Sequence, residues 1–79
     1  MDDSADPVLI DLAGLKCPLP ALKTRKALRG LAPGRRIAVL CTDPLAAIDI
    51  PNLLRETGDA LEAVETGDGH RRFIIRKTG

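Results

Sequence analysis

The sequence predicts an α/β (α+β) fold, a two-layer sandwich in which one four-stranded mixed sheet carries two helices on one face. Two observations indicate this fold. Short apolar, β-branched segments alternate with helical segments in the order β-α-β-α-β-β. The chain has only 79 residues, which is enough for one domain and one core. We predict a single domain over residues 7–79, after a flexible N-terminal tail over residues 1–6.

Glycine and proline separate the strands. The first strand is short, apolar and followed by Gly14, and the last two flank Gly67-Asp68-Gly69, which predicts a hairpin. If the first two strands are parallel, the helix between them makes a right-handed crossover. The four predicted strands are residues 8–12, 36–42, 61–66 and 71–76.

Two segments have helical patterns. The first, residues 18–31, ends before Pro33-Gly34, a stop signal. The second contains Pro51, and a proline fits the first position of a helix better than its interior because it lacks a backbone N–H. We therefore expect a short turn over residues 44–49 and a main helix over residues 51–57.

Composition excludes several classes of protein. The 12 Lys+Arg nearly balance the 11 Asp+Glu. No apolar run reaches 18 residues, so we expect no membrane span. The acidic N-terminus does not resemble a signal peptide, which favours the cytoplasm. In that reducing compartment Cys17 and Cys41 are expected to be free thiols. Two Cys and one His are too few for an ordinary structural zinc site, so we expect no metal.

The chemical signal is Cys17-Pro18-Leu19-Pro20. Pro18 fits the first helical position, which puts Cys17 at the N-cap, where free backbone N–H groups and the helix dipole favour an anion. We therefore expect a lowered pKa and a nucleophilic thiol. Pro20 removes one N–H donor but stiffens the first turn. The alternative is a thiol that only packs as a small apolar group.

A second argument comes from topology. Cys17 follows the first strand and Asp43-Pro44 follows the second, so parallel strands would bring both to one edge of the sheet, where α/β proteins commonly bind ligands. Asp43 is expected to cap the second helical segment, or to face the thiol as a proton acceptor. Cys41 ends an apolar strand, which favours core packing, although it could also serve as a resolving partner for Cys17.

The predicted first helix carries a candidate surface for binding a partner protein. Its outward face carries two leucines beside Cys17, followed by a basic stripe, a mixture that suits an acidic protein surface with an apolar centre. The alternative is an ordinary solvated helix face. Phe73 is the only aromatic residue, so we expect no sequence-specific nucleic-acid binding. His70 is expected to be a solvated loop residue. The predicted partner-binding residues are Leu19, Leu22, Lys23, Lys26 and Arg29, and the arc predicted to face the sheet is Ala21, Thr24, Ala27, Leu28 and Leu31.

Three segments together resemble the TusA/SirA-like sulfur-carrier family: residues 12–20 around Cys17, Pro33-Gly34, and residues 42–51 from Thr42-Asp43-Pro44 to Asp49-Ile50-Pro51. The resemblance runs from about Leu9 to Lys77. It implies that Cys17 carries a persulfide sulfur, received from a cysteine desulfurase or a rhodanese. The acceptor differs between members and serves 2-thiouridine in tRNA, the molybdenum cofactor or sulfur oxidation.

The chain departs from the family pattern at two positions. Gly58-Asp59 replaces a frequent Gly-His after the second helix, which can alter the choice of partner, and Cys41 stands where a residue without a thiol is more usual. Neither departure touches the motif around Cys17.

The sequence thus predicts a carrier that acts with partner enzymes and needs no metal or organic cofactor. Cys17 is the nucleophile and carries the sulfur. Two alternatives remain. A regulatory or RNA-binding module using the basic helix would bind RNA in a salt-sensitive way that Cys17→Ser leaves unchanged. A thiol redox protein would form a disulfide between Cys17 and Cys41. The residues predicted to fix the motif and shape the cleft are Pro18, Pro20, Asp43, Pro44, Asp49 and Pro51.

Overall fold

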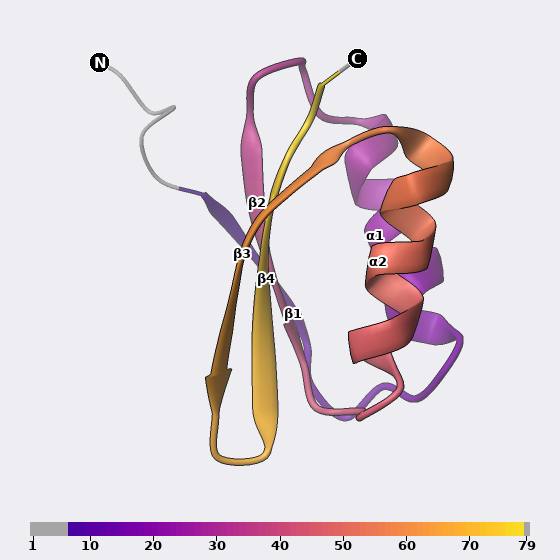
Figure 1. Cartoon of the computed structure of the whole chain (residues 1–79), viewed down its shortest axis with the longest axis vertical. Helices are drawn as coiled ribbons and strands as arrows, with labels where there is room; N and C mark the ends of the chain where they lie inside the picture. The colour runs from indigo at the N-terminus through magenta and orange to yellow at the C-terminus, as the bar shows by residue number, and fades with distance from the viewer. Residues whose placement is uncertain (1–6, 79) are drawn as a thin grey trace.

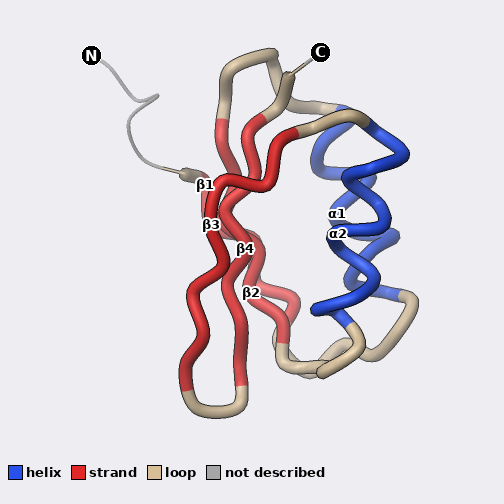
Figure 2. The backbone as a smooth tube through the Cα atoms, viewed as in Figure 1, coloured by secondary structure: helices blue, strands red, loops and turns tan. Residues whose placement is uncertain are grey.

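The computed structural model describes residues 7–78, and its elements follow the predicted order (Figure 1). The two helices lie together on one side of the sheet, so the predicted two-layer fold is confirmed (Figure 2). The predicted tail, residues 1–6, lies outside the described residues. The elements are β1 (Val8–Leu12), α1 (Leu19–Arg29), β2 (Arg36–Cys41), α2 (Ala46–Thr57), β3 (Ala60–Gly67) and β4 (His70–Arg76).

The sheet has the strand order β1-β2-β4-β3. β1 and β2 are parallel, with Leu12 opposite Cys41, whereas β4 is antiparallel to both of its neighbours. The predicted hairpin joins β3 and β4, but its turn contains only Asp68 and Gly69, because Gly67 pairs with His70 as the last residue of β3. Because β1 and β2 end at the same edge of the sheet, the segments that follow them leave side by side (Figures 1 and 2). This edge places Cys17 and Asp43 near each other.

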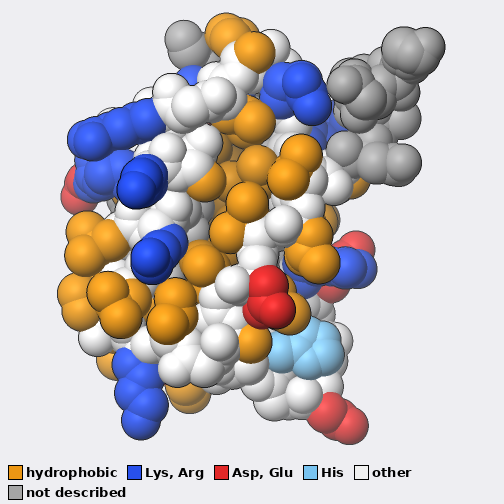
Figure 3. Space-filling view, turned by 180° about the vertical axis from the view of Figure 1, so that it is seen from behind, with side chains coloured by type: hydrophobic (Ala, Val, Ile, Leu, Met, Phe, Trp, Pro, Cys, Tyr) orange, Lys and Arg blue, Asp and Glu red, His pale blue; other side chains and the backbone are white. Residues whose placement is uncertain are grey.

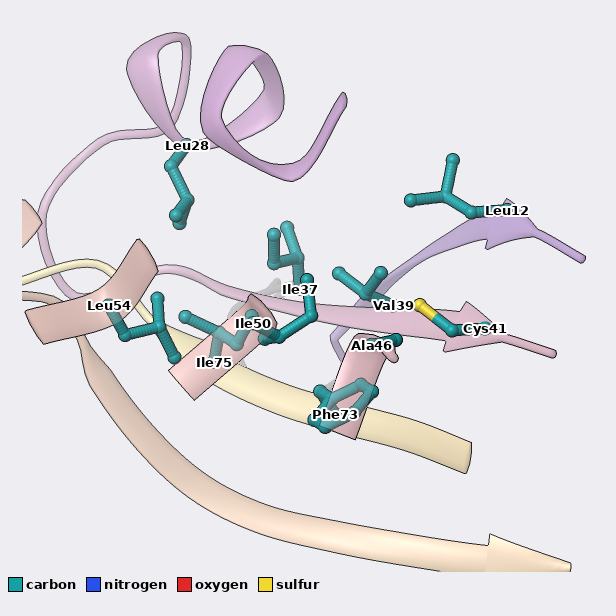
Figure 4. Packing of buried hydrophobic residues seen from close by; sticks show 10 residues of the cluster. All are labelled: Leu12, Leu28, Ile37, Val39, Cys41, Ala46, Ile50, Leu54, Phe73 and Ile75. Atoms are coloured by element: carbon teal, nitrogen blue, oxygen red, sulfur yellow. The ribbon is translucent and has the colours of Figure 1, made fainter. Parts of the chain in front are cut away.

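The core lies between the sheet and the helices (Figure 4). Leu28 extends from α1 toward the sheet, and Ile50 and Leu54 extend from α2. Each such side chain contributes roughly 1.5–3 kcal/mol when it is fully buried. This packing holds both helices, and therefore their N-terminal turns, in fixed positions. The buried hydrophobic cluster consists of Leu12, Leu28, Ile37, Val39, Cys41, Ala46, Ile50, Leu54, Phe73 and Ile75.

The predicted inward face of α1 is confirmed. Thr24 and Leu28 are buried, and the other residues of the predicted arc are half-buried. The Thr24 hydroxyl donates to the backbone carbonyl of Pro20 at 2.7 Å, so this buried polar group is satisfied inside the helix. The helix is shorter than predicted and ends at Arg29, where the N–H of Gly30 bonds to the carbonyl of Ala27.

The prediction for the second helical segment was wrong. α2 is one helix from Ala46 to Thr57, and Pro51 lies inside it. The helix tolerates Pro51 because a proline removes only one hydrogen bond, and the apolar face formed by Ile50, Leu53 and Leu54 is buried. Packing against the core therefore outweighs the local preference of the proline for a first turn.

Candidate functional site

Asp43 joins the two loops at the carboxyl edge of β1 and β2. Its Oδ2 accepts the backbone N–H of Cys17 at 2.5 Å, and its Oδ1 accepts the N–H of Leu45 at 3.1 Å. A second link runs from the N–H of Gly14 to Thr42 Oγ1 at 2.8 Å. The predicted meeting of Cys17 and Asp43 is therefore found. Because Leu45 is the N-cap of α2, Asp43 supports the start of that helix from two residues before the cap.

The predicted place of Cys17 at the helix start was wrong by one residue. α1 begins at Leu19 and its N-cap is Pro18, so Cys17 precedes the cap. The N–H of Leu22 bonds to the carbonyl of Pro18, which makes Pro18 the first acceptor of the helix. The N–H of Cys17 is directed to Asp43 instead. The Cys17 side chain is exposed.

The predicted lowering of the Cys17 pKa was also wrong. The pKa of the thiol is raised, first because the thiol hydrogen-bonds the Asp49 carboxylate, then by desolvation and by the negative charges of Asp49 and Asp43. The pKa of the Asp43 carboxyl is lowered, chiefly by the backbone N–H groups of Cys17 and Leu45. Two carboxylates therefore surround the thiol and favour its protonated form.

A groove between α1 and α2 opens beside Cys17. It has a volume of about 230 Å³, and we call it the interhelical groove. It contains Asp49 as well as Cys17, and it also contains an ion pair in which Arg25 Nη2 lies 2.7 Å from Glu56 Oε1. The groove thus combines apolar walls with charged groups. Its residues are Cys17, Pro18, Ala21, Leu22, Arg25, Asp49, Asn52, Leu53 and Glu56.

The predicted cleft residues divide into two groups. Pro18 and Asp49 line the interhelical groove together with Cys17, and Asp43 is held to them through the Cys17 N–H. Pro20 is buried, and Pro44 lines a separate hollow with Asp43. Pro51 is half-buried inside α2 and is not among the groove residues. The structure therefore brings the two carboxylates to the thiol but does not bring all four prolines there.

Sequence reasoning missed the middle of the groove. Arg25, Asn52 and Glu56 line it, and none of them was among the predicted site residues. A signal was present, since Asp49, Asn52 and Glu56 have the three- and four-residue spacing of one helix face. Without knowing that α1 and α2 lie side by side, that face could not be distinguished from a solvated one.

The predicted partner surface is exposed. Leu19 and Leu22 are 43% and 54% exposed, and the three bases of the stripe, Lys23, Lys26 and Arg29, are also exposed. Figure 3 shows hydrophobic and basic side chains next to one another on the helical side of the molecule. Leu45 and Ile48, at the start of α2, add exposed aliphatic surface that the sequence reasoning did not recognise.

Cys41 packs in the core, as the sequence favoured. It is 1% exposed, its thiol is free, and burial together with the charge of Asp43 raises its pKa to about 11. A buried, protonated thiol reacts poorly in disulfide exchange. This environment weighs against the two-cysteine redox alternative.

The other position that departs from the family pattern is structural in this fold. Gly58 ends α2 in a left-handed conformation, with φ +84°, and Asp59 is buried. Asp59 Oδ1 accepts the N–H of Thr78 at 3.0 Å, whereas Oδ2 has no hydrogen-bond partner among residues 7–78. His70 is exposed, as predicted, although it is the first residue of β4 and not part of the loop.

Residues 7–78 contain neither a cluster of metal ligands nor a helix suited to span a membrane. No group of three or more His, Cys, Asp or Glu side chains is arranged to hold a metal ion there. Among the helices of the same range, none has the length and hydrophobicity needed to cross a membrane.

The sequence matches the model of the family described as sulfurtransferase TusA over residues 8–77. The chain belongs to the TusA family. The fold agrees with this membership: the crystal structure of a SirA-like protein from Desulfitobacterium hafniense superposes with a TM-score of 0.78 at 25% identity. That match covers 91% of this chain and 99% of the other. For this TusA family member, membership implies a sulfur-carrier function exercised in a relay with partner proteins.

Proposed function

We propose that this TusA family member carries sulfane sulfur as a persulfide on Cys17. The Cys17 thiolate attacks the outer sulfur of a donor persulfide, the donor S–S bond breaks, and the donor leaves as a thiolate. Cys17 then holds Cys–S–SH. An acceptor nucleophile attacks the same outer sulfur, and Cys17 leaves as a thiolate that regains a proton. No outside oxidant or reductant is needed, because the sulfane sulfur keeps its oxidation state in each transfer.

The observation that carries this proposal is the environment of Cys17 in a chain of this family. Cys17 is an exposed thiol in a loop whose backbone Asp43 holds in place. It lies beside exposed leucines on a helix with a basic stripe. An exposed thiol on a rigid support can enter the active site of a larger partner. No histidine is near Cys17 in sequence to act as its general base, which disfavours hydrolysis by this thiol.

The finer features of the function are proposals of the same kind. The donor is a cysteine desulfurase or a rhodanese, and the acceptor belongs to tRNA thiolation, molybdenum-cofactor synthesis or sulfur oxidation. The cytoplasm is the proposed location, because a reducing compartment keeps exposed thiols such as Cys17 free.

Intact mass after incubation with a cysteine desulfurase and L-cysteine tests the carrier chemistry. We expect a gain of about 32 Da that a thiol reductant reverses, because one sulfur atom is added as a persulfide. Cys17→Ser should abolish the gain, and Cys41→Ser should retain it. If no gain appears with a desulfurase that charges another carrier, and none appears with a rhodanese and thiosulfate, the persulfide function is refuted.

A charge reversal on α1 tests the partner surface. Lys26→Glu should slow sulfur transfer from the desulfurase about tenfold at low salt, because an acidic partner would be steered less strongly to the basic stripe. Lys77→Glu, placed after β4, is the matched control and should leave the rate unchanged. Equal rates for Lys26→Glu and the wild type would rule out docking through this stripe.

A further inference from the structure

The charges around Cys17 differ from those on the outward face of α1. Asp49 lines the interhelical groove together with Cys17 and raises the pKa of its thiol, and the backbone N–H of Cys17 donates to Asp43 Oδ2 at 2.5 Å. Asp49 reaches the thiol from α2, and Asp43 reaches it from the loop after β2. Two negative groups from separate elements therefore flank the one sulfur atom that reacts.

The nearby cations leave the surroundings of Cys17 with a net negative charge, because they are two against three carboxylates. Lys16 is exposed, and its charge acts on the Asp43 carboxylate. Arg25 lies in the same groove but is paired with Glu56. These five groups, two cationic and three anionic, are the charged side chains of the described residues that line the groove or adjoin Cys17.

We propose that Asp43 and Asp49 form an electrostatic filter, which keeps small anionic sulfur compounds such as thiosulfate away from Cys17 and reserves the thiol for persulfides presented by a partner protein. This inference rests on the proposed carrier function and adds the class of donor. The basic stripe and the filter select at different distances. The stripe attracts an acidic protein over several ångströms, and the filter repels a free anion at the moment of contact.

The chemistry shows why the filter matters. In a direct reaction with thiosulfate, the Cys17 thiolate would attack the outer sulfur of the dianion, sulfite would leave, and a persulfide anion would remain on Cys17. The transition state would place two or more negative charges beside two carboxylates. A partner's persulfide brings its outer sulfur in a form that carries at most one negative charge, and the partner can supply cationic groups along with it. The filter thus makes loading dependent on a partner.

Two alkylating reagents of nearly equal size measure the filter without any sulfur donor. Iodoacetamide is neutral and iodoacetate is an anion, and both react with the thiolate. The ratio of their rate constants cancels the thiolate fraction of each variant and reports the local charge. We expect Asp49→Asn to raise the ratio of iodoacetate to iodoacetamide about 3- to 10-fold at low ionic strength, because one unit charge is removed within a few ångströms. At about 0.5 M salt the increase should shrink, because the screening length falls to a few ångströms.

Glu65→Gln is the matched control. It removes the same charge from an ion pair between Glu65 and Arg72. Arg72 alternates along β4 with the buried core residue Phe73, so this pair lies on the face of the sheet opposite the core, and the ratio should equal that of the wild type. An unchanged ratio in Asp49→Asn, or an increase that persists undiminished at high salt, would overturn the filter. Because the reagents contain no transferable sulfur, this result is independent of whether Cys17 accepts a persulfide.

Discussion

Leu28 is the residue that α1 contributes to the buried hydrophobic cluster of the described residues, and its truncation has a calculable cost. It is 1% exposed and extends from α1 toward the sheet (Figure 4). Leu28→Ala removes a fully buried aliphatic group and leaves a cavity, so we expect a loss of about 3 kcal/mol in the free energy of unfolding. A domain of this length has a total of only about 4–12 kcal/mol, so the variant is expected to be close to unfolding.

The same loss can be expressed as a melting temperature. The unfolding entropy of a chain of this length is about 170 cal/mol/K, so a loss of 3 kcal/mol lowers Tm by about 18 °C. Because the chain has no Trp and no Tyr, far-UV circular dichroism is the appropriate probe of thermal and urea unfolding.

Leu22→Ala is the matched control on the same helix. Leu22 is 54% exposed and lines the interhelical groove, so the same truncation should change the free energy of unfolding by less than about 0.5 kcal/mol. It should instead slow sulfur transfer, if α1 docks the partner. Equal destabilisation by the two substitutions, or a loss below about 1 kcal/mol in Leu28→Ala, would refute the proposed packing of α1.

Three further outcomes follow from the structure. Arg36 and Arg76 lower the pKa of Glu62, so its ion pairs stabilise the fold fully above about pH 4.3, the pKa of an unfolded Glu. This stabilisation is lost as the pH falls through the lower pKa of the folded state. Plots of Tm against pH for Glu62→Gln and the wild type should therefore converge in acid. Iodoacetamide should modify only Cys17 in the native protein, and the pH midpoint of its labelling rate should lie above that of a model thiol. In denaturant, intact mass should show two adducts. Two adducts on the native protein would contradict the burial of Cys41. Gly58→Ala should lower the free energy of unfolding in urea by about 1 kcal/mol, because the backbone there has φ +84°, which disfavours a side chain. The new Cβ itself would meet no described atom within 4 Å. An unchanged urea midpoint would contradict a left-handed helix end.

The sequence was sufficient for the order of elements because local signals agreed with the global fold. Breaks at Gly14, Pro33-Gly34 and Asp68-Gly69 fall between elements in the structure, and the first strand has its predicted bounds. The parallel pairing of β1 and β2 then placed Asp43 beside Cys17 by topology alone. These features depend on short-range sequence patterns.

The features that the sequence did not reveal depend on long-range packing. The direction of the Cys17 pKa depends on Asp49, which is 32 positions later and reaches the thiol only because α1 and α2 lie side by side. The continuation of α2 through Pro51 depends on the burial of Ile50 and Leu54. A helix-start argument considers only the backbone N–H groups of one helix and cannot include a carboxylate from another.

The single carboxylate of Asp43 also has a consequence for the local motions of the site. It accepts the amide hydrogens of Cys17 and Leu45 on its two oxygens, so one movement of this side chain releases both. In hydrogen–deuterium exchange the two amides should therefore report the same opening event, although they are far apart in the chain. The loop that carries the reactive sulfur and the first turn of α2 thus form one cooperative unit, and a partner that touches either segment acts on both.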